Sequence, residues 1–354
     1  MTIPAPPHRS IRIPRLMRLV RGPEAVIAAL SELVERGDRL LLVHSGVRSA
    51  TGYGARIADH ARAGGFRTVE AVVDANSEAC VAQVAAAIEA FGPHLVLGVG
   101  GGRVVDVAKL AAARRDFGAV TIPTQFASDA ICSPVAIIAD EDGRQRSVGA
   151  RMPMAIVVDM DVVDQAPAMT WRAGLGDLVS NLSAVRDWRR AHETRGEEFD
   201  DFASLTSEAA ALSVIEEEAD LADGDYRQKV IRGLILSGIA MEMAGSSRPA
   251  SGSEHLVSHA LDSILAQPRP HGLQVALATI AAGILRGEDG ARLVAFFRRV
   301  GLPVSPADLG ITVDEFMTAV RRGPETRPGR TTILDDVTEA DLEALRAAYA
   351  AGPG

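Results

Sequence analysis

Lysine, cysteine and aromatic residues are all scarce in this chain of 354 residues. Aromatic residues make up 4% of it, which argues against a surface that stacks the bases of single-stranded nucleic acid. Cys80 and Cys132 are the only cysteines and lie far apart, so neither a disulfide scaffold nor a thiolate metal site is expected. Two free thiols are typical of a reducing compartment, and we expect a cytoplasmic protein.

Long hydrophobic runs and an excess of basic residues are missing as well. The sequence contains no run of about 18 consecutive apolar residues, so no membrane-spanning helix is expected. The formal net charge is −9, which disfavours nucleic acid or an anionic membrane as a partner because both require a basic face. A small anionic substrate stays possible, since a few residues can make one site positive.

Lys109 and Lys229 are the only lysines among 37 basic residues. In a chain that otherwise uses arginine, Lys109 indicates a place that requires a compact ammonium group. The alternative is a side chain that extends to solvent at the surface.

Two patterns divide the chain near residue 165. The first part alternates apolar runs, at 39–43, 68–73, 94–100 and 119–123, with helical patterns at 54–63, 76–91 and 104–115. Asn76 is the expected N-cap of the second helix, and 136–139 and 155–159 are expected edge strands. This alternation predicts a doubly wound, Rossmann-like α/β domain with a parallel sheet, whereas the second part predicts an all-helical domain without strands.

A glycine-rich loop with Gly100, Gly101 and Gly102 connects the third strand to the third helix. Glycines let backbone N–H groups close on a phosphate, and the helix start adds positive potential. The spacing fits neither G-x-G-x-x-G nor a Walker A loop, and a tight turn is the alternative. Asp106 and Lys109, in the first two turns of the helix, favour a site.

A second polar loop follows the fourth strand and contains Thr124, Ser128, Asp129 and Ser133. Open α/β sheets bind ligands beyond the carboxyl ends of their strands. Asp129 can hydrogen-bond a substrate hydroxyl, and Thr124 and Ser133 can reach a phosphate or a nicotinamide. A Ser-Asp turn without function is the alternative.

His255, His259 and His271 are three of only eight histidines, and Asp177 lies upstream of them. One carboxylate and two histidines suit a divalent cation with positions left open for substrate. The spacing of His255 and His259 suits two ligands on one helix as well as two surface residues, and the order of H-E-x-x-H is absent. Asp177 by itself is equally typical of a helix N-cap.

Four blocks together resemble the glycerol-1-phosphate dehydrogenase family, within the superfamily of metal-dependent polyol dehydrogenases and dehydroquinate synthase. They are GGGRVVDVAK, PT…SDA…SP, GLGD…N…AVRDW and SSRPASGSEHLVSHALD followed by HG. The resemblance runs from about residue 20 to about 290. It implies a dehydroquinate synthase-like, iron-containing alcohol dehydrogenase-like fold. We expect a flexible leader at 1–16, an NAD(P)-binding domain at 17–165 and a helical metal- and substrate-binding domain at 166–354.

The resemblance also implies roles for single residues. Asp177, His255 and His271 correspond to the ligands of one divalent ion, Zn²⁺ in the first place and Ni²⁺ or Fe²⁺ as alternatives. Asn181 stands where iron-type relatives have a further histidine ligand, which favours the three-ligand site. His259, Asp129 and Asp177 correspond to catalytic and substrate-binding residues. The positions expected to contact NAD or NADP are Gly100, Gly101, Gly102, Asp106, Thr124, Ser128 and Ser133.

The implied reaction is reversible hydride transfer between NAD(P)H and dihydroxyacetone phosphate, which gives sn-glycerol 1-phosphate. Arg248, among several serines, is the candidate ligand for the substrate phosphate. His44, Ser45 and Arg48 follow the first predicted strand where a carboxylate would select NAD, so NADP should be tolerated. Ala127 replaces a usual serine and Ala130 a usual glycine, which leaves the exact substrate open.

Three alternatives remain. One is a dehydrogenase or reductase for another small ketone, aldehyde or polyol, phosphorylated or not. A dehydroquinate synthase-like cyclase is disfavoured by Asp177, because that branch has glutamate as first ligand, and by the scarcity of lysine. A non-catalytic nucleotide-binding protein is disfavoured by the complete ligand set. The expected partner is a small phosphorylated three-carbon molecule, with no nucleic acid and no membrane insertion, and we expect a homo-oligomer.

Overall fold

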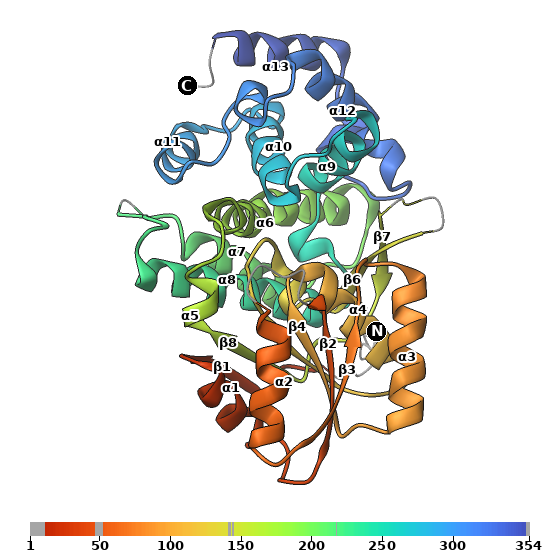
Figure 1. Cartoon of the computed structure of the whole chain (residues 1–354). Coiled ribbons are helices and arrows are strands. Elements are labelled where there is room, and N and C mark those ends of the chain that lie inside the picture. The colour runs from red at the N-terminus through yellow and green to blue at the C-terminus, as the bar shows by residue number, and fades with distance from the viewer. Residues whose placement is uncertain (1–10, 47–51, 141–142, 144, 217, 352–354) are drawn as a thin grey trace, which may run out of the picture.

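Six parallel strands form the sheet in the first part of the chain (Figure 1). This computed structural model describes residues 11–46, 52–140, 143, 145–216 and 218–351. The strand order is β1-β8-β5-β4-β2-β3. The bounds are β1 Leu16–Val20, β2 Arg39–His44, β3 Arg67–Val72, β4 Leu95–Gly100, β5 Ala119–Pro123 and β8 Ala155–Asp159.

Helices cover both faces of this sheet. In β2, Leu40 and Leu42 belong to one hydrophobic core while Leu41 and Val43 belong to another, because successive side chains of a strand point to opposite faces. Two helices pack on each face: α1 Pro23–Leu30 and α2 Tyr53–Ala63 on the first, α3 Glu78–Phe91 and α4 Gly102–Arg114 on the second. The predicted doubly wound architecture is confirmed.

The placement of two strands differs from the prediction. The strand at β8, expected at an edge, lies inside the sheet between β1 and β5. The strand expected at 136–139 is not part of this sheet. It forms β6 (Val135–Ala139), which pairs antiparallel with β7 (Gln145–Gly149). Strand order depends on pairing between distant segments, which the local apolar pattern does not contain.

The N-cap of α3 is Ser77 and not the expected Asn76. The Ser77 hydroxyl accepts a hydrogen bond from the N–H of Cys80 at 3.3 Å. The Asn76 side chain instead donates to the carbonyl of Ile137 at 3.0 Å, which ties the β6–β7 hairpin to the start of α3.

Helices make up the chain after β8, and within the described residues no strand follows Asp159. Helix α6 runs between the sheet and helices α9, α10 and α12, so it connects the two halves of the molecule (Figure 1). The bounds are α5 Met160–Val163, α6 Ala168–Arg195, α7 Asp201–Leu212, α8 Gly224–Ala244, α9 Ser253–Ile264, α10 His271–Leu285, α11 Ala291–Val300, α12 Val313–Thr326 and α13 Glu339–Ala351.

The expected division between residues 165 and 166 falls in the short segment between α5 and α6. Of the expected leader, residues 1–10 lie outside the described residues, and Leu16 is buried as the first residue of β1. None of the helices in the described ranges combines the length and apolar character needed to span a bilayer. Cys80 and Cys132 are buried, free thiols.

Candidate metal and substrate site

Asp177, His255 and His271 come together from three different helices, α6, α9 and α10. The Nε2 atoms of His255 and His271 lie 3.8 and 3.6 Å from Asp177 Oδ1. One ligand atom from each residue lies within 4.8 Å of the other two. A carboxylate oxygen and two imidazole nitrogens at this separation suit a single divalent cation.

Two glycines allow these helices to approach closely enough. A Cβ at Gly272, the residue after His271, would lie 1.8 Å from the carbonyl oxygen of Ala173 in α6. A Cβ at Gly176, the residue before Asp177, would lie 2.3 Å from the carbonyl oxygen of Gly272. The two backbones therefore touch at the point where Asp177 and His271 stand. Asp177 lies in the interior of α6, so its N-cap interpretation is wrong.

His255 and His271 are each oriented through the Nδ1 atom. The Nδ1 of His255 lies 3.0 Å from Glu254 Oε1, and that of His271 lies 2.9 Å from the Ser258 hydroxyl. Burial lowers the pKa of His255 to about 3 and that of His271 well below its usual value, so both rings are neutral. A neutral imidazole fixed through Nδ1 presents the lone pair of Nε2, as a metal ligand must.

Asp129 lies directly beside Asp177. Its N–H donates to Asp177 Oδ2 at 3.0 Å, and Ser128 caps the short turn that Asp129 begins. Asp129 Oδ2 accepts a hydrogen bond from the Ser237 hydroxyl, which in turn accepts one from Asn181. Burial raises the pKa of Asp129 to about 6 and that of Asp177 well above its usual value, and repulsion from Asp129 raises the latter further. Two such carboxyl groups favour a cation between or beside them.

His259 lies on α9 one turn beyond His255. Its ring centroid is 6.0 Å from that of His271 and 6.5 Å from that of His255. Among the described residues, the group that could hold a metal ion does not include His259. Burial lowers its pKa to about 4, so His259 is a neutral imidazole next to the ligands. This position fits substrate contact better than metal ligation.

The glycine-rich loop lies at the carboxyl end of β4, beside that of β5. Gly100 ends β4, Gly101 caps α4 and Gly102 begins it. A Cβ at Gly101 would lie 2.6 Å from the Gln125 side-chain nitrogen, so a larger residue would push that side chain away. The N–H of Thr124 donates to the Gly100 carbonyl at 3.0 Å and joins the two loops. These positions stand at the carboxyl ends of parallel strands, where open α/β sheets bind nucleotides.

Residues 23–167 match the family described as iron-containing alcohol dehydrogenase. The chain is 39% identical over 251 residues to glycerol-1-phosphate dehydrogenase (NAD(P)+) of Hyperthermus butylicus, which covers 70% of this chain and 72% of that protein. The corresponding protein of Thermococcus sibiricus is 42% identical over 253 residues, with the same coverage. The chain belongs to the glycerol-1-phosphate dehydrogenase family. The resemblance carried by the four sequence blocks is confirmed.

Solved structures show that this family member has the fold of iron-containing alcohol dehydrogenase-like proteins, as expected. A probable glycerol dehydrogenase from Sinorhizobium meliloti has a TM-score of 0.73 at 24% identity and covers 97% of this chain and 98% of that chain. Glycerol dehydrogenase from Schizosaccharomyces pombe has a TM-score of 0.76 at 19% identity. The match covers 97% of this chain and 91% of that chain. At these identities the likeness concerns the fold alone.

Ser133 and Asp106, which were expected to contact the cofactor, form hydrogen bonds to the backbone of this glycerol-1-phosphate dehydrogenase family member instead. The Ser133 hydroxyl donates to the Val135 carbonyl at 3.2 Å. Asp106 Oδ2 accepts a hydrogen bond from the N–H of Ile137 at 3.0 Å. Both side chains are buried, and these bonds argue that they support the polypeptide segment that follows the polar loop.

Lys109 is buried, so its interpretation as a surface side chain is wrong. Its Nζ lies 3.1 Å from Asp106 Oδ1. It also donates to three backbone carbonyls, those of Ala130 at 2.5 Å, Ser133 at 3.1 Å and Val135 at 2.7 Å. A compact ammonium group fits such a ring of oxygens better than a planar guanidinium. Lys109 therefore fastens the loop that begins at Asp129 to α4.

Arg248, the expected phosphate ligand, is buried in a different arrangement. Its guanidinium forms a two-pronged ion pair with Glu197, in which Nε donates to Oε1 at 2.6 Å and Nη2 contacts Oε2. Its Nη1 donates to the Thr331 carbonyl at 2.8 Å. These partners argue against phosphate binding by Arg248 and give it the role of joining the end of α6 to the segment after α12.

Several residues near the site were not singled out by the sequence patterns. Glu254 and Ser258 orient His255 and His271, and neither has a distinctive spacing. Arg327 and Arg330 both donate to the Ser247 hydroxyl, in the segment just before α9. Their signal was present in the sequence: Arg-Pro-Gly-Arg is a turn motif that places two guanidinium groups at its two ends.

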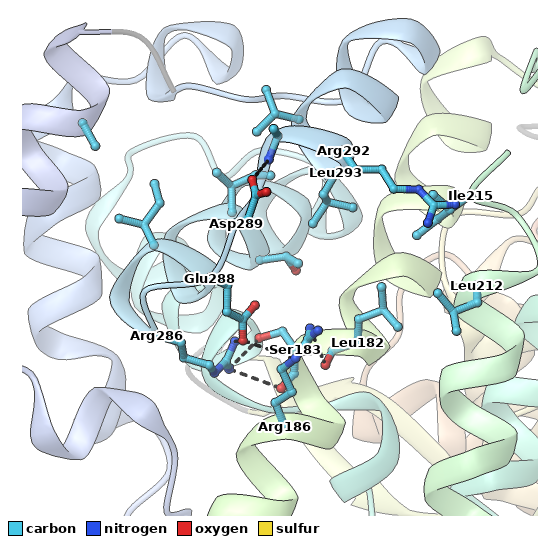
Figure 2. A pocket seen from close by; sticks show the side chains of 18 residues that line it. Leu182, Ser183, Arg186, Leu212, Ile215, Arg286, Glu288, Asp289, Arg292 and Leu293 are labelled. Atoms are coloured by element: carbon cyan, nitrogen blue, oxygen red, sulfur yellow. Dashed lines mark hydrogen bonds and ion pairs between the residues drawn. The ribbon is translucent and has the colours of Figure 1, made fainter. Parts of the chain in front are cut away.

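A separate cavity of about 550 Å³ lies against α6, α10 and α11 (Figure 2). Leu182 and Arg186 of α6, Leu212 of α7 and the segment with Arg286 and Glu288 contribute to its wall. None of the residues predicted for the site lines it. The cavity is therefore separate from Asp177, His255 and His271 and from the glycine-rich loop.

Proposed function

We propose that this protein reduces dihydroxyacetone phosphate to sn-glycerol 1-phosphate with NADH or NADPH and one divalent metal ion. Membership of the glycerol-1-phosphate dehydrogenase family supports the substrate and the reaction. The observation that carries the metal requirement is the convergence of Asp177, His255 and His271, with both imidazoles neutral and fixed through Nδ1. This set fits Zn²⁺ best, while Ni²⁺ and Fe²⁺ accept the same donors.

The proposed chemistry is a balanced hydride and proton transfer. When bound, the metal ion acts as a Lewis acid on the ketone oxygen, and NAD(P)H is the hydride donor. The carbonyl carbon accepts the hydride and the oxygen accepts a proton, so the ketone becomes an alcohol while NAD(P)H is oxidised to NAD(P)+. His259 passes the proton, since a neutral imidazole can release one at one nitrogen and accept one at the other. Asp129 accepts a hydrogen bond from a substrate hydroxyl.

We propose that both NAD and NADP are accepted. His44 ends β2, and its Nε2 lies 2.9 Å from Glu70, whose carboxylate also contacts Arg62. The Arg62 guanidinium offsets the Glu70 charge that would repel a 2′-phosphate. Arg48, also expected to favour NADP, lies outside the described residues.

We further propose a cytoplasmic homo-oligomer. Phe202, Leu205 and Leu212 are exposed on α7 at helical spacing, and their exposed fractions reach 75% at Phe202. An apolar row of this kind is typical of a protein interface. Light scattering coupled to size-exclusion chromatography would give the mass of the assembly. We expect Phe202→Ser to lower this mass.

An assay of NADPH and NADH oxidation tests the proposal. The substrates would be dihydroxyacetone phosphate, dihydroxyacetone and a small set of other ketones and aldehydes, with chiral analysis of the product. We expect dihydroxyacetone phosphate to be reduced fastest, to sn-glycerol 1-phosphate, and chelation to stop turnover. Equal or faster reduction of an unphosphorylated substrate would instead support the alternative of a glycerol dehydrogenase-like reductase.

A further inference from the structure

The segment after α12 contains a tight turn that presents two arginines on the same side. The N–H of Arg330 donates to the carbonyl of Arg327 at 3.2 Å, and Gly329 has φ +85°. Proline at the second position and a left-handed glycine at the third are the requirements of a type II turn. The sequence Arg327-Pro328-Gly329-Arg330 therefore fixes the backbone from which both guanidinium groups project.

This turn is attached beside the first turn of α9, where the ligand His255 stands. Helix α12 packs against α9, and the Thr326 hydroxyl lies 3.4 Å from the carbonyl of Leu256. Arg330 Nη1 donates to the carbonyl of Ser251 at 3.1 Å. The two attachments lie on either side of His255 in the sequence. The turn consequently lies next to the metal site although it is distant from it along the chain.

The two guanidinium groups converge on one oxygen atom. Arg327 Nη1 and Arg330 Nη2 donate to the Ser247 hydroxyl at 3.1 and 2.8 Å. Each guanidinium has five N–H donors, so the bonds to Ser247 and Ser251 use only some of those available. The unused donors are suited to the oxygens of a phosphate, which arginine binds in a forked geometry.

The local charge is positive and only partly balanced. Glu197 pairs with Arg248, and in the part of the chain that the structure describes neither Arg327 nor Arg330 forms an ion pair with a carboxylate. Arg330 is 8% exposed. Burial and the charges of Arg327 and Arg248 lower the pKa of Arg330 to about 9, and the charges of Arg330 and Arg327 also lower the pKa of His255. A buried cation without a counter-ion is costly, so an anionic ligand is favoured here.

We propose that Arg327 and Arg330 form the subsite that binds the phosphate of the substrate, while its carbonyl faces Asp177, His255 and His271. This inference rests on the proposed function and assigns its phosphate specificity to the turn at 327–330. A three-carbon phosphate is short, so the subsite must adjoin the metal ligands, as the attachment beside His255 allows. The same subsite would bind inorganic phosphate, because that ion offers the same oxygens.

The test compares Arg327→Gln and Arg330→Gln with Arg321→Gln, an arginine of the preceding helix that pairs with Glu339 at the surface. For each holoenzyme, kcat/KM is measured for dihydroxyacetone phosphate and for dihydroxyacetone. Binding of inorganic phosphate is measured separately by calorimetry. We expect the ratio of the two kcat/KM values to fall about 100-fold in the first two variants and to stay at the wild-type value in Arg321→Gln. Phosphate binding should weaken in parallel.

The outcomes separate this inference from the proposed function. If both variants keep the preference for the phosphorylated ketone and bind phosphate as before, the subsite assignment is wrong. The proposed function is then unaffected. A wild-type protein that reduces neither ketone but binds phosphate, with loss in the variants, supports the subsite and overturns the proposed function. If Arg330→Gln fails to fold, Arg327→Gln gives the same decision, because the exposed Arg327 does not support the core.

Discussion

His255 and His259 are one helical turn apart on α9, yet their neighbours differ. His255 has Glu254 on Nδ1 and Asp177 near Nε2, whereas His259 lies outside the set of possible ligands found in the described structure. We propose that the same residue type serves two purposes here, at a spacing that does not by itself distinguish them. Their substitutions should separate metal binding from proton transfer.

We predict that His255→Ala loses the metal ion, while His259→Ala keeps it and turns over at least about 100-fold more slowly, a usual cost of removing a general acid. Metal content by mass spectrometry and kcat with dihydroxyacetone phosphate measure the two effects. His60→Ala, which changes a histidine on the outer surface of α2, is the control and should alter neither. Equal metal loss at positions 255 and 259 would mean that both histidines are ligands.

Single residues were predictable where their chemistry is unusual, and their partners were not. The scarcity of lysine drew attention to Lys109, but the carbonyls that surround it come from a loop more than 20 positions later. Arg248 was expected to bind phosphate, but its guanidinium instead pairs with Glu197, which lies 51 positions away in the sequence. A guanidinium pairs with the nearest available anion in space, and the sequence does not give that distance.

At the scale of helices, contact between α6 and α10 determines the separation of Asp177 and His271. A Cβ at Gly272 would lie 1.8 Å from the carbonyl oxygen of Ala173, so the two helices can approach this closely only because glycine has no side chain. Gly283, in the same helix α10, has only the flexible end of Glu288 near it, at 3.6 Å. The two glycines thus form a matched pair for substitution.

We predict that Gly272→Ala destabilises the protein by about 3 kcal/mol, the upper end of the usual cost of overpacking, and weakens metal binding. Gly283→Ala should be neutral or stabilise by about 0.5–1 kcal/mol, because alanine favours a helix interior. Denaturant unfolding and a metal competition titration check both effects. If Gly272→Ala kept wild-type stability and metal affinity, close backbone contact would not be what positions the ligands.

The elements themselves were largely predictable, because apolar runs such as those of β2 and β4 are buried on both faces. The place of β8 inside the sheet was not, since it depends on pairing with β1 and β5 over long distances in sequence. The cap of α3 was missed by one residue. Asn76 and Ser77 have equal capping tendency, and the contact of Asn76 with Ile137 decides between them.

At the scale of the whole molecule, the site depends on elements from both halves of the chain. Asp129 and the glycine-rich loop follow strands of the sheet, and the proposed ligands lie on α6, α9 and α10. The four sequence blocks identified this set because the resemblance covers them together. The turn at 327–330 lies beyond those blocks, so only the folded structure connects it to the site.

A metal ion bound by Asp177, His255 and His271 would link three helices that are far apart in sequence. Because the unfolded chain does not preserve this arrangement, binding should stabilise the folded state, by about 2.7 kcal/mol when free metal is 100 times the dissociation constant. We therefore predict that chelation lowers the unfolding temperature measured by calorimetry and stops turnover, and that added Zn²⁺ restores both. His255→Ala is the control, since its unfolding temperature should not respond to the chelator. If chelation removed the ion and left the unfolding temperature of the wild-type protein unchanged, the ion would not be held jointly by these helices, and the ligand assignment would have to be abandoned.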